Sequence, residues 1–203
     1  MKSTLTFRPL VGALLVIAAV TLVASPANAI PITYKAILDG PSEAPPNASP
    51  GTGFAAVVFD IAAHTMDVKV WFSGLTGTVT ASHIHAATAV AGTGTAGVAT
   101  TTPTFTGFPS GVKAGIYSNV FDMTLASSYR AGYITANGGT ALSAEAALTQ
   151  AAFDGKAYLN IHTNLFPGGE IRGFLQPVPE PASLVLLGTG IAGLGARRWR
   201  KRR

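Results

Sequence analysis

Turn-forming residues interrupt the chain between residues 30 and 177 roughly every ten residues, and this spacing limits the fold more than any other feature. In the segment Met66–Phe72, apolar side chains occupy every second position. A strand places successive side chains on opposite faces, so the segment predicts a half-buried antiparallel strand. Short strands with frequent turns predict an all-β domain. We expect an antiparallel β-sandwich with Greek-key or immunoglobulin-like connections.

One segment departs from the strand pattern. Residues 143–153 contain no Gly or Pro and are rich in Ala, which favours a helix with Ser143 as its N-cap and Gly155 at its end. Residues 86–111 are rich in Thr and Gly without periodicity, and we expect a loop with at most one short strand there. The remaining expected strands cover residues 32–38, 53–60, 78–85, 118–125, 157–163 and 170–175. The sequence therefore predicts one short helix beside the sheet.

The positive charge of the chain is concentrated at its ends. The formal net charge of +5 and the sequence pI of about 9.7 are in the range of nucleic-acid-binding proteins. Eight of the 14 Lys and Arg, however, lie before residue 30 or after residue 196, and the six within residues 30–177 are outnumbered by eight Asp and Glu. The central part is mildly acidic, so we expect no nucleic-acid partner.

Residues 1–29 have the three parts of a secretory signal peptide. Lys2 and Arg8 supply positive charge, residues 10–23 are almost entirely apolar, and Ala27-Asn28-Ala29 is a small-x-small cleavage site. The apolar run is shorter than the ~20 residues that a membrane-spanning helix needs. We expect a signal helix that is removed after Ala29. An uncleaved N-terminal anchor is the alternative.

Residues 178–203 form a second terminal signal. Pro179-Glu180-Pro181 precedes an apolar stretch, Leu184–Ala196, and the chain ends in a cluster of Arg and Lys. Closely spaced prolines are tolerated before a helix but not within one, so the stretch after them predicts a short transmembrane helix. The basic cluster is expected to stay on the cytoplasmic side of the membrane.

This tail resembles the PEP-CTERM sorting signal, in which a Pro-Glu-Pro triplet, a short transmembrane segment and a basic cluster follow one another at the C-terminus. The resemblance implies a bacterium of Gram-negative type and an exosortase that cuts near Pro179-Glu180-Pro181. It also implies transient anchoring in the inner membrane and a mature protein at the cell surface, associated with extracellular polysaccharide. A plain C-terminal membrane anchor is the alternative.

Three of the four histidines lie on expected strands. His83 and His85 are two residues apart, so they share a face of one strand while Ile84 points to the other face. His162 lies on the polar face of a later strand. A His-x-His pair on a strand is a typical arrangement for binding copper or zinc through imidazole nitrogens.

Two interpretations of these histidines are open. The first is a copper or zinc site formed by His83, His85 and His162. The second is a hydrogen-bond network without a metal, in which Glu170 and Arg172, two residues apart on one strand face, act as structural or orienting partners.

The motifs around the histidines resemble the CHRD domain, the module named after chordin, for which no reaction is firmly assigned. The matching segments are Leu38-Asp39-Gly40 with the following Glu43 and Pro45-Pro46, Ser73-Gly74-Leu75-Thr76-Gly77, His83-Ile84-His85, Asn160-Ile161-His162-Thr163 and Pro167-Gly168-Gly169-Glu170-Ile171-Arg172-Gly173. The longer stretch Ala86–Ala91 departs from the family pattern. The first histidine strand is also similar to the copper-ligand strand of copper/zinc superoxide dismutases, which implies a related sandwich. The further histidines and cysteines of those enzymes have no counterpart here.

Two functions follow from this sequence. The first is a non-enzymatic, structural or adhesive domain of the cell surface or extracellular matrix. The second is a metal-binding or redox protein that uses the three histidines. The sequence has no cysteine and no nucleophile elbow or Walker motif, so an enzyme is less favoured than a binding or structural protein.

Overall fold

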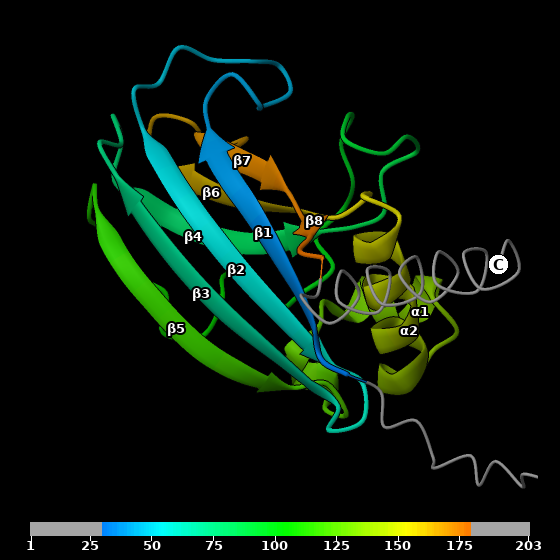
Figure 1. The fold of residues 1–203 in the computed structure, drawn as a ribbon. Coiled ribbons are helices and arrows are strands. Elements are labelled where there is room, and N and C mark those ends of the chain that lie inside the picture. The colour runs from blue at the N-terminus through cyan, green and yellow to red at the C-terminus, as the bar shows by residue number, and fades with distance from the viewer. Residues whose placement is uncertain (1–29, 180–203) are drawn as a thin grey trace, which may run out of the picture.

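A computed structural model describes residues 30–179 of the chain (Figure 1). The expected signal helix with Ala27 and Ala29, the sorting residues Glu180 and Pro181, and the expected transmembrane helix lie outside the described residues. The strands are β1 (Ile32–Asp39), β2 (Thr52–Asp60), β3 (Thr65–Ser73), β4 (Val79–His85), β5 (Gly115–Asp122), β6 (Tyr158–Thr163), β7 (Ile171–Phe174) and β8 (Gln176–Pro177). Within residues 30–179, no helix is long and apolar enough to cross a membrane.

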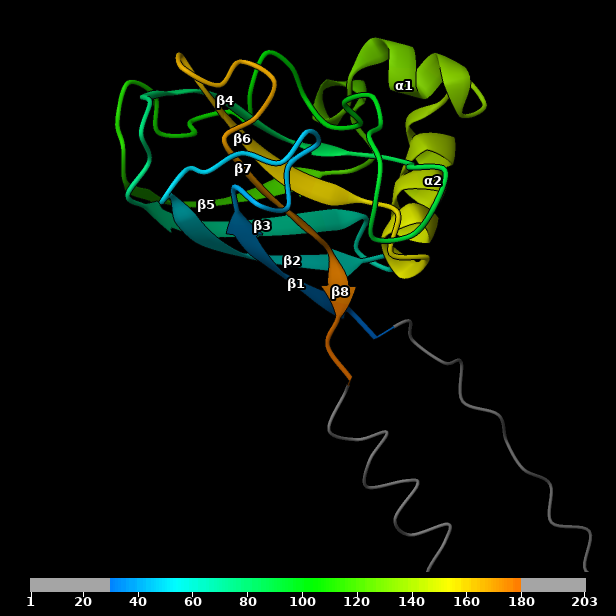
Figure 2. The ribbon, with the colours of Figure 1, turned by 90° about the horizontal axis from the view of Figure 1, so that it is seen from above.

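The strands form one antiparallel sheet in the order β4-β6-β7-β1-β2-β3-β5, with β8 added to β1. The sheet curls so that β4 and β6 lie across β1, β2 and β3, as in a sandwich (Figures 1 and 2). The prediction of an all-β domain is therefore confirmed.

The prediction of a single short helix is wrong. The described residues contain a 3-10 turn, η1 (Ala126–Ser128), and two α-helices, α1 (Ala131–Ala136) and α2 (Ala141–Phe153), which lie at one end of the sheet (Figure 2). Thr140, not Ser143, is the N-cap of α2. The Thr140 hydroxyl accepts from the Ser143 amide at 3.1 Å, and the Ser143 hydroxyl accepts from the Thr140 amide at 3.1 Å. This reciprocal capping box extends the helix one turn earlier than expected.

Alternation along the strands places one apolar face of the sheet in the core. The expected strand Met66–Phe72 lies within β3, and its alternate residues Met66, Val68, Val70 and Phe72 are at most 2% exposed. Tyr34 of β1 and Phe59 of β2 meet edge to face in the same core, with ring centroids 5.8 Å apart. Burial of this face is the main source of stability, because each large apolar side chain contributes roughly 1.5–3 kcal/mol.

An apolar row crosses the outer face of the sheet. Ile37 pairs with Phe54, Phe54 with Trp71, and Trp71 with Ile116, so four strands each contribute one side chain to the row. All four side chains are exposed, Trp71 by 48% and Ile116 by 75%.

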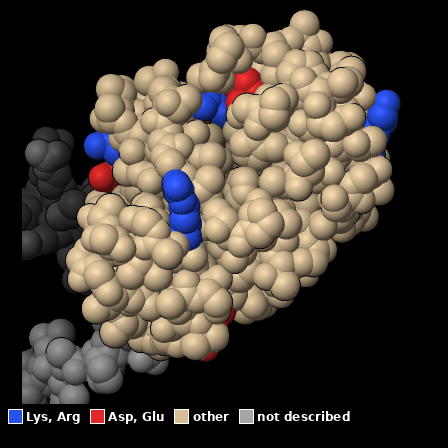
Figure 3. Space-filling view, turned by 180° about the vertical axis from the view of Figure 1, so that it is seen from behind, with Lys and Arg blue, Asp and Glu red and all other residues tan. Residues whose placement is uncertain are grey.

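Figure 3 shows the molecule from behind, opposite to the view of Figure 1. Charged residues are scattered on this face, and they form no basic patch there.

Candidate metal centre

The curled sheet brings the three predicted histidines together on one face. His83 and His85 lie on β4 and His162 on β6, and the two strands are antiparallel neighbours in which Ala81 pairs with His162. Ile84, between the first two histidines, is fully buried in the apolar core on the opposite face. The pleat of β4 thus separates an apolar face from a histidine-bearing face.

The three rings are close enough to share one ion. Their centroids are 5.1 Å apart for His83 and His162, 5.6 Å for His83 and His85, and 5.8 Å for His85 and His162. Each ring offers a ligand nitrogen within 4.8 Å of those of the other two. Nitrogens bound at about 2.0–2.1 Å to one tetrahedral zinc ion lie roughly 3.4 Å apart, so small side-chain rotations would close the site.

Backbone carbonyl groups determine which nitrogen of each ring is free. His83 Nε2 lies 2.6 Å from the Pro103 carbonyl oxygen, His85 Nδ1 2.9 Å from that of Ala96, and His162 Nδ1 2.9 Å from that of Pro167. A carbonyl only accepts hydrogen bonds, so each of these nitrogens carries the proton. The lone pairs are left on His83 Nδ1, His85 Nε2 and His162 Nε2, which are buried and have no hydrogen-bond partner among the described residues.

This arrangement fits a metal ion better than a closed hydrogen-bond network. A metal-binding histidine usually donates its second N–H to a carbonyl or carboxylate, which fixes the ring and its tautomer. All three rings do so here. A buried acceptor without a donor costs roughly 1–3 kcal/mol, and a bound cation would remove that cost from three nitrogens together.

Burial keeps the three rings neutral. It lowers the pKa of His83, of His162 and, to about 4, of His85. The hydrogen bonds to the backbone carbonyl groups act to raise the pKa of His83 and His85. A positive charge on His162 would lower the pKa of both residues further. A lowered histidine pKa means that the lone pairs are available to a metal at neutral pH.

Two irregular segments supply the carbonyl groups that hold the rings. Ala96 and Pro103 belong to the long loop between β4 and β5, and Pro167 belongs to the connection between β6 and β7. The stretch 86–111 contains no strand, only the isolated bridges from Val98 to His85 and from Thr100 to Tyr129. Its composition predicted a loop but gave no sign that the loop covers the histidines.

Tyr158 and Arg172 lie beside the histidines. The Tyr158 ring stacks on His85, with centroids 4.8 Å apart and planes at 1°. The Arg172 guanidinium lies 4.7 Å from the centroid of the Tyr158 ring and donates to the carbonyl groups of Ser42 and, at 2.9 Å, Gly94. Arg172 therefore ties two covering loops to β7.

Glu170 has a separate structural role. Its carboxylate accepts from the hydroxyl groups of Ser49 at 2.6 Å and Thr163 at 2.7 Å, and from the amides of Thr76 and Gly77. Burial acts to raise the pKa of Glu170, but these four hydrogen bonds outweigh it and lower the pKa. Among the described residues, Glu170 pairs neither with Arg172 nor with a histidine ring.

Glu43, which precedes two prolines in the loop between β1 and β2, lies beside Arg172 and Asn160. Its side chain is only 6% exposed, so it is not a solvated loop acid. Its Oε2 lies 3.8 Å from Arg172 Nε and 3.5 Å from Asn160 Nδ2. Burial raises the pKa of Glu43 to about 7, although Arg172 acts to lower it.

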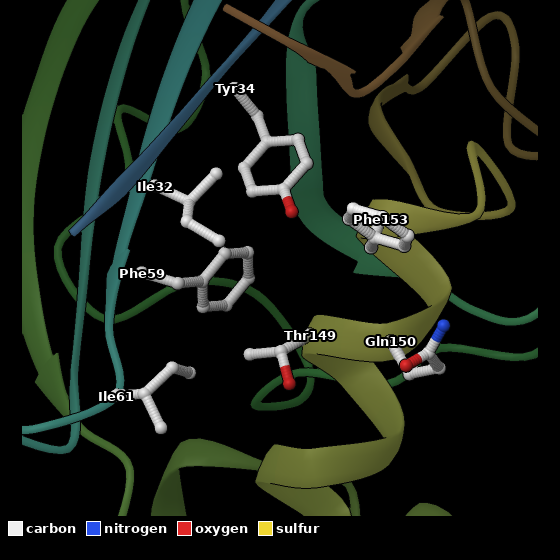
Figure 4. Close-up of a pocket in the computed structure, with 7 residues that line it drawn as sticks. All are labelled: Ile32, Tyr34, Phe59, Ile61, Thr149, Gln150 and Phe153. Carbon is white, nitrogen blue, oxygen red and sulfur yellow. The ribbon is translucent and has the colours of Figure 1, made fainter. Parts of the chain in front are cut away.

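Among the described residues, no second group of three or more His, Asp or Glu side chains lies close enough to hold a metal ion. An apolar hollow of about 290 Å³ lies between the β1–β2 hairpin and α2 (Figure 4), and its lining, which includes Tyr34, Phe59 and Phe153, carries no histidine or carboxylate. The fourth histidine, His64, occupies the β2–β3 turn and contacts Glu145 of α2 at 2.7 Å, away from the other three.

The fold and the side chains together define an all-β domain with a convergent cluster of three imidazole rings, two of them buried and the third half-buried. A family model for the CHRD domain matches residues 34–175, so this chain belongs to the CHRD domain family. The PEP-CTERM protein-sorting motif matches residues 177–203, which marks the chain as a protein exported to the cell envelope or surface and processed by an exosortase. No curated protein and no solved structure matches the chain.

Proposed function

We propose that this exported CHRD domain binds one copper or zinc ion through His83, His85 and His162. The observation that carries the proposal is the set of three buried, unpartnered lone pairs on rings whose other nitrogens are held by carbonyl groups. Imidazole suits both copper and zinc, so the ligand set alone admits either metal. Copper would allow a redox role, and zinc would allow a structural or Lewis-acid role.

Metal titration tests this proposal. The purified chain, stripped of metal, should bind about one equivalent of zinc or copper per chain in calorimetry. The variant H83A/H85A should lose at least about 100-fold in affinity, because it removes two of the three ligands. The matched control is H64A, which removes the histidine outside the cluster and should bind metal like the wild type. Equal affinity in wild type and H83A/H85A would contradict the site.

We also propose a structural or adhesive role at the cell surface, with extracellular polysaccharide as the partner. The outer row of Ile37, Phe54, Trp71 and Ile116 supports this role, because exposed apolar rows on a sheet are typical of contact surfaces. The variant F54A/W71A should sediment less with the polysaccharide of the producing bacterium, whereas L142A, an exposed apolar residue on α2, should not change. Identical sedimentation of all three proteins would rule the row out.

The two ends are proposed to be processed. Removal of residues 1–29 after Ala29 and cleavage near Pro179-Glu180-Pro181 would leave a mature domain of about residues 30–177 after transient anchoring in the inner membrane. Mass spectrometry of the mature protein should give an N-terminus at Ile30 and no peptide beyond the triplet. An intact C-terminus through Arg203 would contradict processing.

We further propose that the connections are of Greek-key type, related to those of immunoglobulin-like or superoxide-dismutase-like sandwiches. The β4–β5 connection joins the two ends of the strand order, and the β3–β4 connection joins one end to the strand next to the other end, whereas a simple meander joins only neighbours. An experimental structure of the domain tests this connectivity directly.

A further inference from the structure

Five of the six buried side-chain atoms that lack a hydrogen-bond partner in the described part of the chain belong to one cluster. Three are the free histidine nitrogens. The other two are oxygens, Glu43 Oε1 and Asn160 Oδ1, and the sixth, Asp67 Oδ1, lies on β3. An ion bound to the nitrogens would leave both oxygens unsatisfied, since an oxygen acceptor needs a hydrogen-bond donor.

The two oxygens lie next to the histidines. Asn160 is paired with His83 across β4 and β6, a relation that places Cβ atoms about 4.5–5.5 Å apart. It is also two residues from His162, so it shares the histidine-bearing face. Glu43 reaches this point from the β1–β2 loop, where its Oε2 lies 3.5 Å from Asn160 Nδ2.

The side chains of Asn160 and Glu43 both pack against Gly169. A Cβ added to Gly169 would stand 2.5 Å from Asn160 Nδ2, 2.6 Å from Asn160 Oδ1 and 2.6 Å from Glu43 Oε1. The two oxygens are therefore at most about 5.2 Å apart, a separation that one water molecule can bridge because each of its hydrogen bonds is about 2.7–2.8 Å long. The other ends of both side chains are already engaged, because Asn160 Nδ2 faces Glu43 Oε2 and Glu43 Oε2 faces Arg172.

We propose that Glu43 and Asn160 position a water molecule as the fourth ligand of the ion held by His83, His85 and His162. This inference rests on the proposed metal site and adds its open coordination position. The water oxygen would bind the ion, and its two hydrogens would be donated to Glu43 Oε1 and Asn160 Oδ1. All five unpartnered atoms would then have a partner. Three protein ligands plus water is the ligand set of a site that can exchange a ligand, unlike a closed structural site.

The test uses the full chain loaded with copper(II), whose electron paramagnetic resonance lines broaden in water enriched in oxygen-17 when a water is directly bound. The wild type should show this broadening. Glu43→Gln should abolish it, because the amide oxygen would face Arg172 and turn an N–H₂ donor toward the water. Asn160→Leu should abolish it as well, and both variants should lose about 10–100-fold in copper affinity while still binding one ion.

Two further variants serve as controls. Asn160→Asp keeps an acceptor oxygen and should retain the broadening, and Glu145→Gln alters a buried carboxyl group on α2 outside the cluster and should behave like the wild type. Stoichiometric copper without broadening in the wild type would overturn this proposal alone. Broadening that persists in the Glu43→Gln, Asn160→Leu double variant would also overturn this proposal alone. A direct hydrogen bond between the Glu43 and Asn160 side chains, in place of the water, would overturn it too. Failure of the wild type to bind copper would overturn the metal site and this inference together.

Discussion

Replacing Gly173 by alanine should destabilise the domain more than any other single methyl group added to the sheet. A Cβ at this position of β7 would lie 2.0 Å from the backbone carbonyl oxygen of Ile37 in β1. A backbone atom within a paired strand cannot rotate away as a side chain can, so β1 and β7 would have to separate. The pairing of β7 with β1 joins the two halves of the curled sheet, and we expect a loss of at least about 3 kcal/mol in the free energy of unfolding.

Thermal unfolding followed by circular dichroism measures this effect. For a domain of this size, a loss of about 3 kcal/mol lowers the melting temperature by roughly 6–12 °C. The matched control is Gly168→Ala, because a Cβ at Gly168 has no atom within 4 Å and the backbone there is not left-handed. If the Gly173→Ala variant has the same melting temperature as Gly168→Ala, β1 and β7 do not approach each other as closely as described.

Replacing Arg172 by methionine should have the second largest effect. Arg172 is 4% exposed and donates to the carbonyl groups of Ser42 and Gly94, and its guanidinium lies over Tyr158. Methionine fills much of the space but leaves both carbonyl groups without this donor and Glu43 without a nearby cation. Breaking a buried charged pair by removing one partner costs about 3–5 kcal/mol.

Denaturant unfolding of Arg172→Met, with Arg172→Lys as the control, measures the loss. Lysine keeps the charge but not the planar, multiply donating group, so Arg172→Lys should fall between the wild type and Arg172→Met. A loss below about 1 kcal/mol in Arg172→Met would mean that the hydrogen bonds from Arg172 to the two loops are solvated and contribute little to stability.

Strict alternation made the strands of the sheet predictable. Met66–Phe72 has no good alternative to a half-buried strand, and it lies within β3. The expected strand at 118–125 is instead Gly115–Asp122, because pairing with β3, and not local composition, sets the ends of β5. Helix α1 was missed because its sequence, Ala-Gly-Tyr-Ile-Thr-Ala, contains Gly and a β-branched Thr and has no side-chain N-cap.

The candidate metal centre was predictable only in part. The spacing of His83 and His85 requires that they share a face of any strand, and their proximity to His162 follows from the pairing of β4 with β6. The carbonyl groups of Ala96, Pro103 and Pro167 could not be predicted, because every residue carries one and only the fold selects among them. The burial of Glu43 could not be predicted from its loop sequence, because it results from contacts with distant residues such as Asn160 and Arg172.

X-ray absorption spectroscopy of the zinc- or copper-loaded protein tests the central claim most directly, because it reports the atoms bound to the ion. The three-histidine site predicts three imidazole nitrogens at about 2.0–2.1 Å, with a remaining ligand that is oxygen. In the His162→Ala variant one imidazole contribution should be lost. A first shell of oxygen ligands alone, or a spectrum unchanged by His162→Ala, would contradict the site.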